Sequence, residues 1–114
     1  MEPIDGDVLR GHLEGLILSS LQRGHAHGFE ILRRLEAAGS GALRLNEGSL
    51  YPALYRMESA GLIKGEWERN DAPRRGPRRR IYRLTAKGKR RLDQARGDFE
   101  RFVSVIGGIL GATT

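Results

Sequence analysis

The chain lacks cysteine and any long apolar run. None of its 114 residues is cysteine, which excludes disulfides and thiolate metal sites. The longest apolar run, GLILSSL at residues 15–21, is far too short to span a bilayer. The first residues, MEPIDGD, are acidic and lack the basic start of a secretory signal peptide. We therefore expect a single small domain in the cytoplasm.

Charge is abundant and unevenly distributed. Residues 1–63 carry six arginines and eight acids, a net charge of −2, whereas residues 64–114 carry fourteen Lys and Arg and six acids, a net charge of +8. Six arginines fall within APRRGPRRRIYR at residues 72–83. Such a concentration of positive charge predicts a polyanionic partner, the alternative being a solvated basic surface without a binding role.

Four segments have apolar residues every three or four positions, the spacing of one helix face. The expected helices begin at the N-cap Asp7, near Phe29, at Asn46 or Ser49 as the N-cap, and after the N-cap Thr85. Pro52 must lie in or near the first turn of the third helix, because deeper inside it would clash with the preceding turn. The inward-facing residues of the second and third helices are expected to be Phe29, Ile31, Leu32 and Leu35, and Leu50, Leu54 and Met57.

Three short segments, residues 42–45, 64–69 and 79–84, are expected to be strands. The last two flank NDAPRRGPR, which predicts a β-hairpin with a long arginine-rich tip. Three helices followed by such a hairpin give a mostly α (α+β) fold with the winged helix-turn-helix order. The expected division is a DNA-binding domain over residues 1–85 and a long C-terminal dimerisation helix over residues 86–114, both in one compact unit.

Three stretches resemble PadR-type transcriptional regulators. LEGLILSSLQRGHAHGFEIL resembles the first two helices of that family, GSLYPALYRMESAGLI its signature, and GPRRRIYRLTAKGKRRL its wing strand and the start of its last helix. The length resembles the short branch, which has no separate C-terminal domain. The resemblance implies a homodimeric regulator of double-stranded DNA, most often a repressor, without a cofactor. Two positions depart from the family: Phe29 and Ile81 stand where it often has tyrosine.

The candidate DNA contacts come from the third helix, the wing and the start of the second helix. Arginine suits this role because it pairs with phosphates through two parallel hydrogen bonds. By the resemblance, the Tyr51 hydroxyl contacts the DNA backbone; the alternative is a tyrosine packed at the helix edge. Arg56 either contacts DNA or pairs with an acid such as Glu58. The candidates are Ser49, Tyr51, Tyr55, Arg56, Arg74, Arg75, Arg78, Arg79, Arg80 and His27.

Other functions find little support in the sequence. His25 and His27 have no acidic or thiol companion nearby, so we expect turn and capping residues rather than a metal site. No catalytic motif is present, so we expect no enzyme. A basic RNA-binding protein would explain the charge but not the order of the elements. A third possibility is a regulator that acts by protein contact alone, with the wing unused.

The last helix carries an apolar seam at heptad spacing. Such a stripe, left exposed, promotes aggregation, so we expect it to pair with a second copy in a symmetric dimer. The alternative folds the helix back on its own core. The resemblance also implies a planar apolar effector near Phe99 and Phe102. The seam consists of Leu92, Ala95, Phe99, Phe102, Ile106 and Ile109, widened by Val103 and Leu110.

Overall fold

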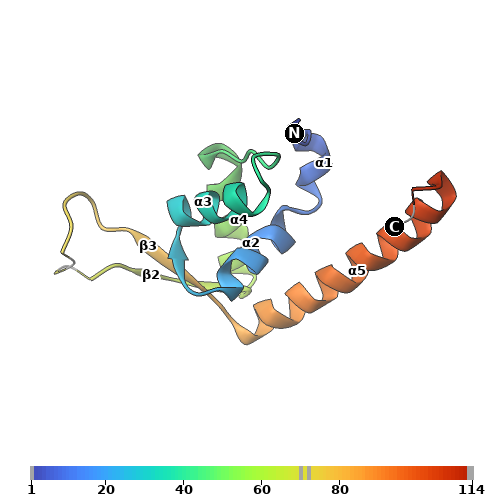
Figure 1. Ribbon diagram of the computed structural model, residues 1–114. Coiled ribbons are helices and arrows are strands. Elements are labelled where there is room, and N and C mark those ends of the chain that lie inside the picture. Colours follow the sequence, from blue (N-terminus) through green and yellow to red (C-terminus); the bar gives the residue numbers. More distant parts are fainter. Residues whose placement is uncertain (1, 70, 72, 113–114) are drawn as a thin grey trace.

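The computed structural model describes residues 2–69, 71 and 73–112. Four helices form a compact body, with a β-hairpin extending from one side and the last helix from the other (Figure 1). The mostly helical α+β class expected from the sequence is confirmed. The elements are α1 (Gly6–Arg10), α2 (Leu13–Gln22), β1 (Ala26–His27), α3 (Gly28–Ala38), α4 (Glu47–Ser59), β2 (Ile63–Trp67), β3 (Arg80–Leu84) and α5 (Ala86–Leu110).

The core lies between α2, α3, α4 and one face of the small sheet. The expected α4 stripe of Leu50, Leu54 and Met57 is buried in it. Its opposite walls come from Ile17 and Leu18 of α2, together with residues of α3 and β2. No buried side-chain nitrogen or oxygen of the described residues lacks a hydrogen-bond partner. Because α4 buries the face that carries Leu50, Leu54 and Met57, its opposite face is left exposed.

Side-chain caps define the starts of the last two helices. The Ser49 amide donates to Asn46 Oδ1 at 2.9 Å, so Asn46 is the N-cap of α4 rather than Ser49. Thr85 caps α5 as expected, accepting from the Gly88 amide at 3.0 Å. Pro52, expected in or near the first turn, lies in the second turn of α4. The helix continues because only one intrahelical bond, that from position 52, is lost.

The expected first helix is divided in two. α1 ends at Gly11 and α2 begins after His12. Glycine is a poor helix former, so the apolar periodicity continues across a backbone break. The expected N-cap Asp7 is also wrong, because Asp5 fills that position and accepts from the Asp7 amide at 2.8 Å.

The expected strand at residues 42–45 is not formed. Ala42 and Leu43 are buried, but this segment has no strand partner, and the Ala42 carbonyl accepts instead from the Ile4 amide at 2.8 Å. The third strand of the sheet is instead β1, a segment that was expected to form a turn. It pairs with β3, Ala26 opposite Tyr82, so the sheet order is β1-β3-β2, all antiparallel.

The hairpin is formed by β2 and β3, which pair from Ile63 opposite Leu84 to Trp67 opposite Arg80. These strands confirm the expected hairpin, with bounds one or two residues from those expected. Its connection includes positions 70 and 72, which lie outside the described residues. In α3, Ile31 and Leu35 face inward as expected, but Phe29 is 53% exposed, its ring lying under the Arg33 guanidinium at 5.9 Å.

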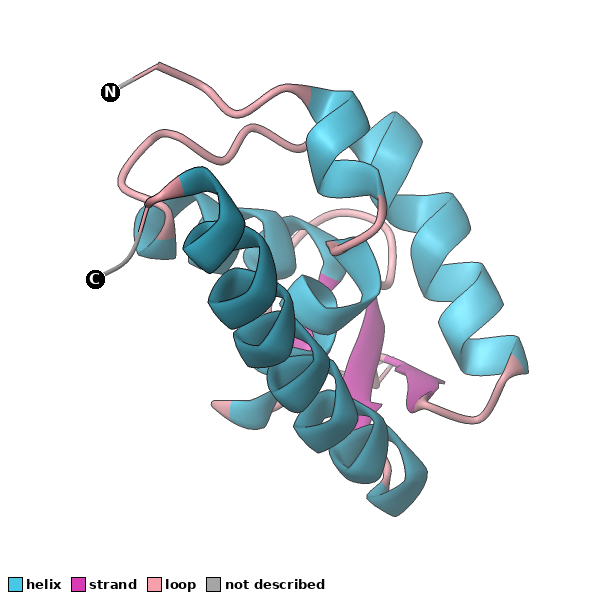
Figure 2. Ribbon diagram, turned by 90° about the vertical axis from the view of Figure 1, so that its right-hand side faces the viewer, coloured by secondary structure: helices cyan, strands magenta, loops and turns pink. Residues whose placement is uncertain are grey.

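α5 packs on the body with its first half only. Leu92 is buried in the chain's own core, and Ala95 lies against Gly15 of α2. The second half of the helix extends away from the body (Figure 1), and in the view of Figure 2 α5 lies in front of the rest of the chain. The radius of gyration is accordingly 15.7 Å, against about 13 Å for a compact chain of this length. No helix among the described residues is long and apolar enough to cross a membrane.

Candidate nucleic-acid interface

The outward face of α4 carries the polar residues expected there. Ser49, Tyr55 and Arg56 are exposed, Tyr55 by 75%. Tyr51 is 44% exposed and its ring lies on Gly28 at the start of α3, where an added Cβ would be 2.6 Å from the tyrosine oxygen. Tyr51 therefore joins α4 to α3 while keeping part of its ring at the surface.

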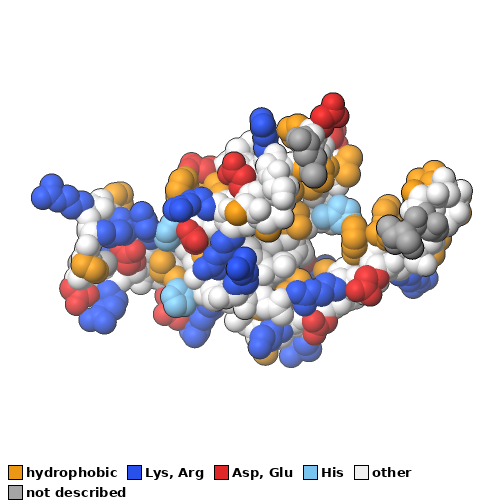
Figure 3. All heavy atoms as spheres, in the orientation of Figure 1, with side chains coloured by type: hydrophobic (Ala, Val, Ile, Leu, Met, Phe, Trp, Pro, Cys, Tyr) orange, Lys and Arg blue, Asp and Glu red, His pale blue; other side chains and the backbone are white. Residues whose placement is uncertain are grey.

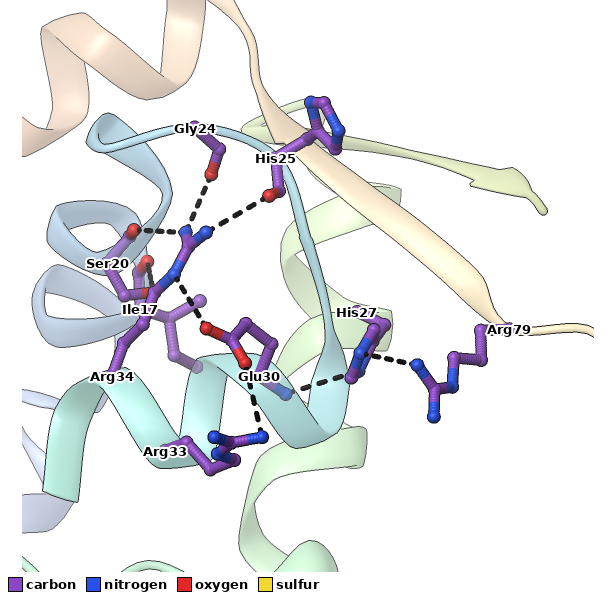
Figure 4. A network of polar contacts seen from close by, with 9 residues as sticks. All are labelled: Ile17, Ser20, Gly24, His25, His27, Glu30, Arg33, Arg34 and Arg79. Atoms are coloured by element: carbon purple, nitrogen blue, oxygen red, sulfur yellow. Dashed lines mark hydrogen bonds and ion pairs between the residues drawn. The ribbon is translucent and has the colours of Figure 1, made fainter. Parts of the chain in front are cut away.

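His27 caps α3 and reaches the wing (Figure 4). The Glu30 amide donates to its Nδ1 at 3.2 Å, and the Arg79 Nη1 lies 3.0 Å from its Nε2. A neutral imidazole accepts at one nitrogen only, so the tautomer of His27 decides whether Nδ1 accepts from Glu30 or Nε2 accepts from Arg79. Burial, followed by the charge of Arg79, lowers the pKa of His27. The corner between α3 and the wing therefore holds a guanidinium and an imidazole beside the start of α3.

Arg34 holds the turn between α2 and α3. Its guanidinium donates to the carbonyls of Ser20 at 3.0 Å, Gly24 at 2.8 Å and His25 at 3.3 Å, and lies 3.6 Å from Glu30 (Figure 4). The Ser20 carbonyl lies in the last turn of α2, and those of Gly24 and His25 follow the end of the helix, so none of them has an intrahelical donor. Nothing in the sequence singles out Arg34 for this role, because it is one of many arginines. No group of three or more metal-ligating side chains occurs among the described residues.

Arg74 is held inside the wing tip. It makes a two-pronged ion pair with Glu68 at 2.9 and 3.1 Å, and both side chains are mostly shielded from water. It also donates to the carbonyls of Arg75 at 3.1 Å and Pro77 at 2.7 Å. Arg74 therefore ties the two sides of the tip together.

Arg80 is held where the pairing of β2 with β3 ends and the tip of the wing begins. Its Nη2 lies 2.6 Å from Glu58 Oε2, and its guanidinium lies 5.3 Å from the centre of the Trp67 ring. The hydrogen bond that Arg80 donates to Glu58 raises the pKa of Arg80. Tyr55, Glu58, Ser59 and Arg80 line one surface hollow, which brings the exposed face of α4 next to the wing. The sequence did not predict the roles of Glu58 and Trp67.

The remaining wing arginines lie at the surface. Arg75 is exposed, and within the described part of the chain its guanidinium has no partner. Arg78 is exposed and its guanidinium lies 5.9 Å from the Trp67 ring centre, while Arg79 contacts His27. Basic side chains gather at the wing and along the adjoining lower body (Figure 3). The five candidate arginines of the wing thus divide into two held by acids and three at the surface.

An exposed helix following a helix-turn unit, with a basic two-stranded hairpin beside it, defines a winged helix-turn-helix DNA-binding protein. Residues 17–94, more than half of the chain, match the Transcriptional regulator PadR-like family. The chain belongs to this family of transcriptional regulators. It is therefore a DNA-binding regulator rather than an enzyme, and the resemblance found in the three sequence stretches is confirmed.

Individual relatives agree with this assignment. A transcriptional regulator of Mycobacterium tuberculosis is 33% identical over 93 residues, which cover 81% of this chain and 80% of the relative. The structure of a transcriptional regulator from Clostridium thermocellum superposes with a TM-score of 0.81 at 30% identity, covering 90% of this chain and 97% of the other. A PadR family regulator from Eggerthella lenta gives a TM-score of 0.78 at 29% identity, covering 94% and 88%.

Proposed function

We propose that the chain is a homodimeric repressor that places α4 in the major groove of an operator and its wing on the adjacent groove or backbone. The observation that carries this proposal is one continuous surface. Tyr51 links α4 to the start of α3, and the contact between His27 and Arg79 links α3 to the wing. A duplex lying on this surface meets all three elements at once.

The most exposed residues of α4 are proposed to contact the edges of the bases. Ser49, Tyr55 and Arg56 project from the face opposite the core and have the donors that base edges and phosphates accept. For Arg56, no ion pair with Glu58 is found among the described residues, since Glu58 pairs with Arg80. Arg56 therefore remains available for DNA.

A phosphate is the proposed occupant of the corner between α3 and the wing. In the tautomer of His27 whose Nδ1 accepts from the helix, Nε2–H and the Arg79 guanidinium both point donors at this corner. A phosphate oxygen accepts from both donors and removes the unfavourable contact between them, and the positive end of α3 adds to the attraction. The Tyr51 hydroxyl, close by over Gly28, provides a third donor.

Dimerisation is assigned to the second half of α5, residues 99–110. At heptad spacing from Phe99, its apolar residues occupy the two seam positions and both flanking positions, a face wider than a two-stranded coiled coil needs. Figure 3 shows apolar side chains along the side of α5 that faces the body. Leu92, already buried, has little surface left for a partner. The exposed apolar residues are Phe99, Phe102, Val103, Val105, Ile106, Ile109 and Leu110.

We keep the division proposed from the sequence, a DNA-binding domain over residues 1–85 and a dimerisation helix over residues 86–114, of which the second half makes the dimer contact. Two α4 helices then read a roughly palindromic operator. Regulation of bacterial genes places the dimer in the cytoplasm.

A planar apolar effector is proposed between the paired helices. Phe99 and Phe102 are about half exposed, and the His12 ring meets Phe99 edge-on at 5.7 Å. We infer that the matching residues of a second copy complete this site. A ligand stacked there changes the spacing of the two DNA-binding heads and releases the operator.

Gel-shift titration with matched probes tests the function. Duplex DNA, single-stranded DNA and double-stranded RNA of one sequence are compared at fixed salt. We expect the duplex DNA to bind most tightly, because α4 fits a B-form major groove and not the deep, narrow one of RNA. Equal or tighter binding of either other probe would favour the RNA-binding alternative. For the effector, loss of duplex binding on adding planar aromatic ligands is expected, and no change with any of them would refute that part.

A further inference from the structure

Arg80 joins the recognition helix to the wing. It is the first residue of β3, and Glu58 lies in the last turn of α4. Their side chains meet at 2.6 Å and are 30% and 32% exposed, so the pair is partly shielded from solvent and salt. Exposed pairs contribute little, but a partly shielded hydrogen-bonded pair fixes the relative position of the elements that carry it.

The neighbouring residues of β2 hold this pair from the side. At Gly65 an added Cβ would lie 2.7 Å from Arg80 Nε and 2.9 Å from Glu58 Oε1, so both side chains lie over this glycine and would have to shift for a larger residue. Trp67, the cross-strand neighbour of Arg80, places its ring 5.3 Å from the guanidinium. A cation over an indole face is attracted to it. Arg80 is thus fixed by an acid, an aromatic ring and the backbone of β2.

We propose that Arg80 does not bind DNA and is instead a positioning residue, which with Glu58 sets the angle between α4 and the wing and thereby the discrimination between DNA sequences. This inference rests on the proposed function. Base readout by α4 and backbone contact by the wing must be satisfied on the same duplex, so their relative position decides how well a correct sequence is distinguished. The adjacent Arg75 has no such partner among the described residues and provides the contrast.

The salt dependence of DNA binding separates the two roles. Each cation that neutralises a phosphate adds about 0.9 to the slope of log K against log salt. A positioning arginine adds nothing to this slope, because its charge is already paired with a carboxylate. Its loss instead lowers the specificity ratio, defined as the affinity for the preferred duplex divided by that for a scrambled one.

The experiment uses the full chain and two duplex probes of roughly 30 base pairs, about three helical turns. One is enriched from a randomised pool by the wild type, and the other is its scrambled sequence. Variants Arg80→Gln, Glu58→Gln and the exchange Glu58→Arg with Arg80→Glu are compared with the control Arg75→Gln. Thermal unfolding of each variant confirms that it is folded.

We expect Arg75→Gln to reduce the slope by about 2 in a dimer and to leave the specificity ratio unchanged. Arg80→Gln and Glu58→Gln are expected to lower the ratio on the order of three- to tenfold, a typical coupling for residues in contact. Arg80→Gln leaves the slope unchanged. The exchange recovers part of the ratio relative to either single variant, because it restores an ion pair across the same gap.

Three results would overturn the inference. In the first, Arg80→Gln reduces the slope as Arg75→Gln does and keeps the ratio, which makes Arg80 a phosphate contact. In the second, Glu58→Gln raises the affinity for both probes equally, which means that Glu58 only repels the DNA phosphates. In the third, the exchange is no better than the single variants. A wild type that binds no duplex at all refutes the proposed function itself, an outcome distinct from these three.

Discussion

Replacing Phe102 with aspartate is expected to split the proposed dimer. Phe102 is 54% exposed in the single chain. Half of an aromatic side chain corresponds to about 100 Å², and burying that area contributes about 2.5 kcal/mol. Symmetry doubles this to about 5 kcal/mol, more than three orders of magnitude in the dissociation constant. The unpaired carboxylate adds a further cost of desolvation.

Sedimentation velocity at about 10 µM chain measures the effect, since dimerisation depends on concentration. The matched control is Ser104→Asp, which adds the same charge at the helix position farthest from the seam. Wild type and Ser104→Asp are expected to sediment at twice the chain mass of 12.7 kDa, and Phe102→Asp at that mass. A monomeric wild type, or a Phe102→Asp that remains dimeric, would refute the assignment of α5 to dimerisation.

Three further predictions concern the DNA-binding surface. The double variant Arg75→Ala with Arg79→Ala removes four cations from a dimer, so the slope of log K against log salt is expected to fall by roughly 3 to 4, and binding of the preferred and the scrambled duplex is expected to weaken equally. An unchanged slope would contradict the placement of the wing on phosphates. Gly28→Ala puts a new Cβ 2.6 Å from the Tyr51 hydroxyl oxygen and forces the ring to move, so we expect about 1–3 kcal/mol lower stability by denaturant titration and weaker DNA binding. Stability and DNA affinity equal to those of the wild type would mean that the ring moves without consequence. The pKa of His27 is lowered in the fold, so the stability that His27 contributes is present above its unfolded pKa of about 6.5 and is lost as the pH falls below that value. His27→Asn keeps a capping oxygen and is expected to lose less stability on acidification than the wild type. An identical loss of stability would exclude a role of His27 in this pH dependence.

Local signals in the sequence were sufficient for much of the fold. Thr85, Asn46 and the apolar spacing of α4 each act within one turn of their own helix, so their roles follow from neighbouring residues. The break at Gly11 and the two-residue strand β1 do not. β1 exists because β3, more than fifty residues later, offers a free edge. Residues 42–45 show the opposite case, since their alternating pattern also fits an extended loop packed on the core.

The candidate site likewise has one part that could be predicted from the sequence and one part that could not. A basic tip was evident from composition, but composition treats Arg74, Arg75 and Arg80 alike. Their difference depends on partners that the fold brings near: Glu68 across the tip and Glu58 from the end of α4. These pairings depend on strand register and helix placement, which no spacing rule in the sequence specifies.

The most direct test of the central claim is selection of a preferred duplex from a randomised pool by the wild-type protein, followed by footprinting of the enriched sequence. A dimer that reads DNA with two α4 helices predicts an inverted repeat with half-site centres about 10 base pairs apart or a multiple of that spacing. Its bases are expected to change when Tyr55 and Arg56 are replaced. Enrichment of no sequence, of a single unrepeated half-site, or of the same repeat by the Tyr55 and Arg56 variants would contradict the claim.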